Sequence, residues 1–164
     1  MPEQRNIRPP LQRPNDRTPD KNMADEQVST LGIQIGEDLW LVEMSDISEV
    51  LPLPPITTVP FTKRWYCGVA NVRGNVYSVV DMAAFMGHAE VLHDGRDRVL
   101  LVAQKFAFNA GLLVNRVLGL RNVRAWNRSE ADGKVQYQDP QGQVWQQLNE
   151  PRLLQQPDFL HVES

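Results

Sequence analysis

The residue types that carry out catalysis or bind metals are few in this chain, and their spacing suits neither task. The sequence holds three histidines, His88, His93 and His161, and one cysteine, Cys67. Their positions match no metal pair on a helix or strand, and no serine stands in a nucleophile-elbow pattern. Asp81 closes a β-rich run before a short helical one, where a carboxylate fits an N-cap better than a general base. The sequence therefore predicts no enzyme, no cofactor and no metal site.

Composition excludes several further classes of protein. The chain has 164 residues and a formal net charge of −3, so no global basic field attracts nucleic acid or anionic lipid. Its first residues lack an apolar signal region, and no run approaches the ~20 apolar residues of a membrane span. A single cysteine forms no intrachain disulfide, which is typical of a reducing compartment. We expect a cytoplasmic protein with no direct membrane insertion. A loose group of arginines leaves nucleic-acid binding as a weak alternative: Arg116, Arg121, Arg124 and Arg128.

Residues 1–28 differ from the rest of the chain. They hold five prolines, charges of both signs and almost no large apolar side chains. Such a segment cannot bury enough apolar surface to offset the entropy of ordering it. We expect a disordered tail over residues 1–28 and a single domain over residues 29–164.

From Leu31 onward, short β-rich runs alternate with turns. Residues 31–44 predict a hairpin around Gly36, and Ser45 is expected to cap one helical turn after it. Residues 50–59 contain three prolines, so they suit an edge strand or an extended connector. One turn of helix is expected within residues 61–68. A second short helix is expected to follow Asp81 and to stop at Gly87.

The second half of the chain continues in the same way. Residues 98–117 and 117–126 are β-rich, and residues 134–148 predict a hairpin around the sequence DPQG. Asn149 can cap a last helix that ends before Pro157. Many short strands with brief helices are typical of small antiparallel barrels or a sandwich, so we predict an all-β protein with a few short helices.

The stretch GVANVRGNVYSVVDM, residues 68–82, predicts a hairpin with Gly74-Asn75 as its two-residue loop. This register places Ala70, Val72, Tyr77 and Val79 toward a core, and Val69, Asn71, Arg73, Val76, Ser78 and Val80 on the outer face. The outer face is then a contact patch rather than a solvated face. An arginine beside apolar groups favours a carboxylate partner, for which Glu43, Asp46 and Glu49 are candidates. The alternative is an ordinary solvated arginine at the end of a strand.

This stretch also resembles the signature of CheW-like domains, which runs approximately G-V-x-N-L-R-G-x-V-x-P-V-x-D-L. Residues 39–68, LWLVEMSDISEVLPLPPITTVPFTKRWYCG, are similar to the segment that precedes the signature. Residues 98–120 resemble the second half of the domain. The C-terminal LLQQPDFLHV is similar to the variant of type IV pilus twitching-motility pathways. The resemblance covers residues 31–162.

The resemblance implies a fold of two packed, interleaved five-stranded SH3-like barrels and a non-enzymatic role. Such adaptors couple the cytoplasmic tip of a methyl-accepting receptor to the regulatory domain of a CheA-type histidine kinase, in receptor arrays at the inner membrane. Matched by motif, the receptor-binding residues would be Ile47, Glu49, Gly68 and Arg73. The family pattern also implies a salt bridge between Glu49 and Arg73, in a groove between the barrels.

The sequence departs from the family pattern at Asn115, where aspartate is usual, and at Ser78, where proline is usual. Residues 139–148 also replace a family segment. These changes concern the kinase-facing surface, so no kinase-contact residue is assigned. Alternatives to a twitching-motility adaptor are a flagellar chemotaxis CheW and a stand-alone SH3-like module that binds short peptides.

Overall fold

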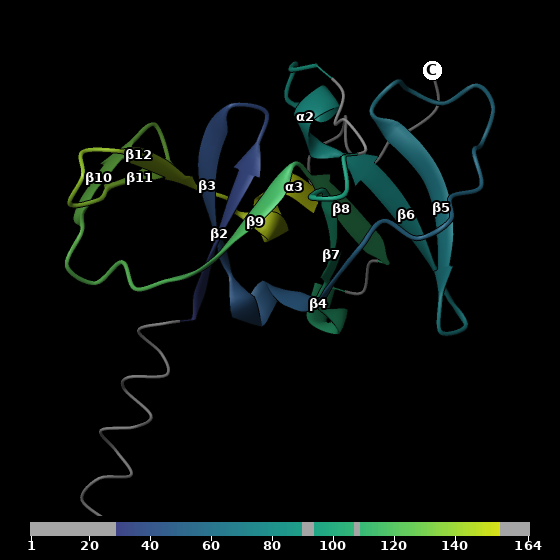
Figure 1. Cartoon of the computed structure of the whole chain (residues 1–164), viewed down its shortest axis with the longest axis horizontal. Coiled ribbons are helices and arrows are strands. Elements are labelled where there is room, and N and C mark those ends of the chain that lie inside the picture. The colour runs from purple at the N-terminus through teal and green to yellow at the C-terminus, as the bar shows by residue number, and fades with distance from the viewer. Residues whose placement is uncertain (1–28, 90–93, 107–108, 155–164) are drawn as a thin grey trace, which may run out of the picture.

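The structure is a computed structural model that describes residues 29–89, 94–106 and 109–154 (Figure 1). The expected tail, residues 1–28, lies outside the described residues. So do His93, His161 and the predicted helix end before Pro157.

The described chain folds into two β-sheets with short helices, which confirms the predicted all-β class. One sheet has six strands in the order β10-β11-β12-β3-β2-β9, and the other has five in the order β4-β7-β8-β6-β5. The strand bounds are β2 Thr30–Ile35, β3 Asp38–Glu43, β4 Ile47–Leu51, β5 Tyr66–Val72, β6 Asn75–Asp81, β7 Arg98–Val102, β8 Ala110–Val114, β9 Arg116–Arg121, β10 Asn127–Ala131, β11 Lys134–Gln138 and β12 Val144–Gln147.

The chain forms the five-stranded sheet from one continuous segment that lies between the two parts of the six-stranded sheet. It builds β2 and β3 of the six-stranded sheet, crosses to make the whole five-stranded sheet, and returns for β9 to β12 (Figure 1). The six-stranded sheet therefore joins two distant parts of the chain, and the two sheets share one hydrophobic core. A single cluster of buried side chains contains Ile33 and Val42 from the first sheet with Val79, Leu100 and Leu112 from the second.

Two features of the sheets differ from the expectation. The first sheet has six strands instead of five, because β10 adds an edge strand whose five residues are all exposed. The pairs β12–β3 and β6–β8 are parallel, whereas antiparallel barrels were expected. Both parallel pairs join strands that are distant in the sequence, and no turn signal predicts such pairings.

Of the four predicted helical segments, two form as expected and begin at their predicted caps. Helix α2, Met82–Phe85, begins after Asp81, whose carboxylate accepts a hydrogen bond from the Ala84 amide at 3.2 Å. Helix α3, Glu150–Leu154, begins after Asn149, whose side chain accepts from the Arg152 amide at 3.1 Å. Two further 3-10 turns, η2 and η3, span Met44–Asp46 and Gln104–Phe106.

The other two helix predictions are wrong. Ser45 lies inside η2, and the residue before that turn is Glu43, which makes no capping hydrogen bond among the described residues. Within residues 61–68 the described chain has turns and the start of β5 instead of a helix. The Tyr66 amide donates to the Lys63 carbonyl in a single turn, and β5 pairing takes over at once.

Candidate protein-docking site

The β5–β6 hairpin carries Arg73 at its tip. Val72 pairs with Asn75, so the two-residue loop is Arg73-Gly74 and the predicted loop Gly74-Asn75 is wrong by one residue. Both loop residues have positive φ, 50° at Arg73 and 87° at Gly74, as the favoured tight hairpin turn requires. The Asn71 side chain accepts a hydrogen bond from the Gly74 amide at 3.0 Å and stabilises this turn.

The hairpin faces are mostly as predicted. Ala70, Val72, Tyr77 and Val79 are buried in the core. On the other face Asn71 and Val76 are exposed, and they pair across the strands. Val80 was expected outside but is buried, because that face of β6 is covered by the hydrophobic cluster at the end of the strand opposite the turn.

Glu49 reaches the surface because strand β4 carries a β-bulge. In a regular strand Ile47 and Glu49 would share one face, but the pairing with β7 shifts between them. Ile47 is buried, and Glu49 is about one-third exposed. The intervening Ser48 directs its hydroxyl to the Leu101 carbonyl at 3.2 Å. The bulge therefore separates a core residue from a surface carboxylate two positions later.

Arg73 and Glu49 form an ion pair through Nη2 and Oε1. This is the pair that the resemblance implied, and it selects Glu49 from the three candidate carboxylates. Asp46 instead pairs with Lys105 at 2.8 Å. Burial, then the nearby Asp46, raises the pKa of Glu43.

Gly68 and Ile47 support the hairpin from beneath the surface. Gly68 has φ 135°, and a Cβ at this position would lie 2.2 Å from the Thr57 carbonyl oxygen. That close approach allows Thr57 and Val69 to exchange backbone hydrogen bonds of 2.8 and 2.9 Å. Both matched residues are buried, so their places in the structure are explained by packing, while Arg73 and Glu49 are the accessible members of the set.

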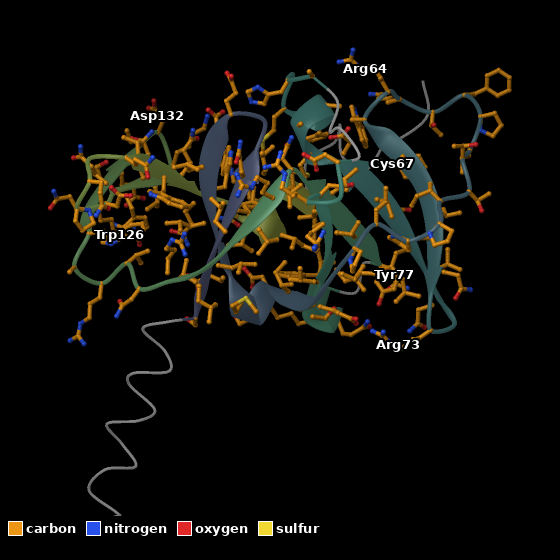
Figure 2. All side chains as sticks on the ribbon, in the orientation of Figure 1. Arg64, Cys67, Arg73, Tyr77, Trp126 and Asp132 are labelled. Atoms are coloured by element: carbon orange, nitrogen blue, oxygen red, sulfur yellow. The ribbon has the colours of Figure 1, made fainter. Side chains whose placement is uncertain are left out.

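The Arg73–Glu49 ion pair does not lie in a groove between the two sheets, where the resemblance placed it. Arg73 lies at the free end of the β5–β6 hairpin, away from the six-stranded sheet (Figure 2). A hollow of about 850 Å³ is lined by both halves, including Trp40 and Gln146 from one sheet and Phe85 and Met86 from the α2 region. Neither Arg73 nor Glu49 is among the described residues that line it.

Of the three candidate histidines, the structure describes His88. Its Nε2 atom lies 3.2 Å from Asp38 Oδ2. The described residues include no group of three histidine, cysteine or acidic residues that could hold a metal ion. Among them there is also no helix long and apolar enough to cross a membrane.

Asp139, in the predicted DPQG turn, is a buried carboxylate that organises this end of the six-stranded sheet. It accepts hydrogen bonds from Trp145 Nε1 at 3.0 Å and from the amides of Gln141 and Gln143 at 2.9 Å. The bond from Trp145 is the main cause that lowers the pKa of Asp139. The carboxylate therefore holds the turn in place.

Sequence reasoning missed Lys105 and Asn71. Lys105 lies in the 3-10 turn η3, where its Nζ pairs with the distant Asp46 and stands 5.3 Å from the centroid of the Phe106 ring. Asn71 was placed on the outer face, but its bond to the Gly74 amide depends on the true loop register.

A conserved-domain model described as "CheW-like domain" matches residues 29–157. This match covers most of the chain, and the two-sheet fold agrees with it. The chain belongs to the CheW-like domain family.

Among individual relatives, the chain is similar to "Protein PilI" of Pseudomonas aeruginosa, with 33% identity over 104 residues, 63% of this chain. It is also similar to "Chemotaxis protein CheW" of Thermotoga maritima, with 29% identity over 105 residues, and to "Protein FrzA" of Myxococcus xanthus, with 33% over 90 residues. The matched stretch spans 58% of the PilI chain, 68% of the Thermotoga chain and 56% of the FrzA chain.

A solved structure shares the fold. It is the "scaffolding protein TtCheW from Thermoanaerobacter tengcongensis", with a TM-score of 0.61 and 17% sequence identity. The similarity covers 79% of this chain and 93% of that chain.

Proposed function

We propose that this protein is a non-enzymatic adaptor of chemosensory signalling that couples a methyl-accepting receptor to a CheA-type histidine kinase. Membership in the CheW-like family supports this class of function. The observation that carries the site is the Arg73–Glu49 ion pair, formed by the two accessible residues of the matched receptor-binding set. The protein would work in the cytoplasm, recruited to receptor arrays at the inner membrane.

Within this proposal the four matched residues have different tasks. Arg73 and Glu49 touch the receptor tip, and the pair fixes the direction in which the guanidinium points. Ile47 and Gly68 shape the surface from below, since both are buried. An exposed ion pair is worth only about 0–1 kcal/mol to folding, so its loss affects binding more than stability. Single contacts of this kind are weak, and an array supplies strength through many simultaneous contacts.

We propose type IV pilus twitching motility as the output of the pathway. The similarity to Protein PilI and the C-terminal LLQQPDFLHV support this assignment. A flagellar role is the alternative, because proteins named as chemotaxis CheW match at 27–29% identity.

Co-purification tests the adaptor role. The tagged full chain is mixed with a receptor cytoplasmic fragment and the kinase regulatory domain from the same organism, separately and together. An adaptor retains both partners and bridges them in one complex. Retention of a short receptor peptide without the kinase would instead indicate a stand-alone SH3-like binding module.

The variant Arg73→Ala locates the receptor contact. It is expected to lose the receptor fragment, to keep the kinase domain and to keep its far-UV β-sheet spectrum. Arg96→Ala is the matched control, since Arg96 is exposed to a similar extent and pairs with Asp94 in the loop before β7. If Arg73→Ala retains the receptor as well as Arg96→Ala does, the assigned site is wrong.

A further inference from the structure

A second ion pair is formed just before the strand β4 that carries Glu49. Asp46, at the end of η2, pairs through Oδ1 with Lys105 Nζ at 2.8 Å. Lys105 belongs to η3, which directly follows β7. The Asp46 carbonyl accepts a hydrogen bond from the Ala103 amide at 2.9 Å, so the ladder between β4 and β7 continues to this pair.

The two pairs form one strip along the start of β4. Ile47 pairs with Val102 and Glu49 with Leu101, while Asp46 stands at the next step. Asp46 and Glu49 are three residues apart, so their Cα atoms are separated by at most about 10 Å. β4 and the β5–β6 turn lie toward the same, lower side in Figure 1. We define the docking strip as Asp46, Lys105, Ser48, Glu49 and Arg73.

The cations of the docking strip stand farther out than its carboxylates. The side chains of Arg73 and Lys105 are 68% and 52% exposed, but those of Glu49 and Asp46 are only 34% and 15% exposed. The carboxylates therefore orient the cations from beneath, and the outermost charge of the strip is positive. These outward-facing cations occur on a chain whose formal net charge is −3.

We propose that Lys105, held by Asp46, is a second docking cation, and that the partner surface on this strip carries carboxylates facing Arg73 and Lys105. This inference rests on the proposed function, in which the partner is the receptor tip. Exposed cations with oriented donors attract acidic side chains and set the encounter rate and register of a complex.

Glu43 is a further acidic group near Lys105. It lies at the end of β3, and burial together with the neighbouring Asp46 raises its pKa, while the charge of Lys105 acts in the opposite direction.

The test measures binding of the receptor cytoplasmic fragment to the full chain at low and at physiological salt. Lys105→Glu is expected to weaken binding about three- to tenfold and to reduce its salt dependence. Lys105→Gln, which adds no repulsion against Asp46, is expected to cause a smaller loss in the same direction. Lys105→Arg keeps the charge and should retain binding.

Arg96→Glu is the matched control, because Arg96 precedes β7 whereas Lys105 follows it, at the opposite end of the strand. It changes net charge by the same amount as Lys105→Glu and should leave binding nearly unchanged. If wild type binds but Lys105→Glu and Lys105→Gln bind equally well, the second docking cation is refuted and the adaptor role stands. If both reversals weaken binding equally, only net charge matters and the strip is refuted. If wild type does not bind the receptor, the proposed function falls and the inference falls with it.

Discussion

Arg73 and Glu49 form an ion pair although they come from opposite edges of the five-stranded sheet. Glu49 belongs to β4, the first strand in the order β4-β7-β8-β6-β5, and Arg73 lies in the turn that leads out of β5, the last strand. The chain after β4 also reaches β5, where Thr57 bridges Val69. The sheet therefore curves until its two edges approach each other, and the ion pair marks the place on the surface where they meet.

Because Thr57 lies close to β5, we expect substitution of Gly68 to lower the free energy of unfolding strongly. Gly68→Ala is expected to destabilise the fold by about 3 kcal/mol, since it adds both a clash with the Thr57 carbonyl and an unfavourable φ. Urea unfolding measures this change. Gly74→Ala is the control, because Gly74 also has positive φ but no atom would contact its Cβ within 4 Å. It should cost only about 1 kcal/mol. Equal losses in the two variants would show that the Thr57 contact does not matter.

We expect Asp139 to cause part of the loss of stability of the protein at low pH. Its pKa is lowered in the folded state, mainly by the hydrogen bond from Trp145, so its contribution to stability is present above the unfolded pKa of about 3.9. That contribution is lost as the pH falls through the lower folded value. Asp139→Asn should lower the Tm at pH 7 and flatten the decline of Tm below pH 4, followed by tryptophan fluorescence. An unchanged acid decline in the variant would contradict this role.

We expect the contribution of Glu43 to folding stability to depend on pH in the opposite direction. Burial and the neighbouring Asp46 raise its pKa, so the folded state binds this proton more tightly than the unfolded chain does. The contribution of protonated Glu43 to the stability of the folded state is present below the unfolded pKa. It is lost as the pH rises through the raised pKa of the folded state. Glu43→Gln is therefore expected to raise the Tm at pH 7 and to lose that advantage near pH 4. A lower Tm at pH 7 would mean that the carboxylate makes a favourable contact there.

Local signals in the sequence predicted the elements that depend on neighbouring residues. The β2–β3 hairpin follows from Gly36 between two alternating runs, and Ile35 pairs with Asp38 across this turn. Helices α2 and α3 follow from Asp81 and Asn149, whose side chains cap the first turn as predicted. These features need only steric and hydrogen-bonding preferences over a few residues.

Features that depend on tertiary contacts were less predictable. The loop of the β5–β6 hairpin was misplaced because both Arg73-Gly74 and Gly74-Asn75 contain the glycine that a tight turn favours, and positive φ at arginine is uncommon. Strand β10 has five exposed residues, so it carries no apolar alternation to reveal it. The parallel pairs join distant segments without a local signal.

The candidate site shows the same division. Residue chemistry alone indicated that Arg73 needs a carboxylate and left three candidates, and only family resemblance singled out Glu49. The bulge at Ser48 that brings Glu49 to the surface is set by pairing with β7 and has no signature in the residues ISEV. The Asp46–Lys105 pair joins residues 59 positions apart and likewise had to be seen in space.

The most direct test of the docking site is a double-mutant cycle at Arg73 and Glu49, with receptor-fragment binding and thermal unfolding measured on every variant. Arg73→Ala and Glu49→Ala should each weaken receptor capture with little change in Tm, and the double variant should lose less than the sum of the two single losses, because Glu49 orients the guanidinium of Arg73. Strictly additive losses in the double variant, or losses that accompany unfolding, would contradict a docking site organised by this pair.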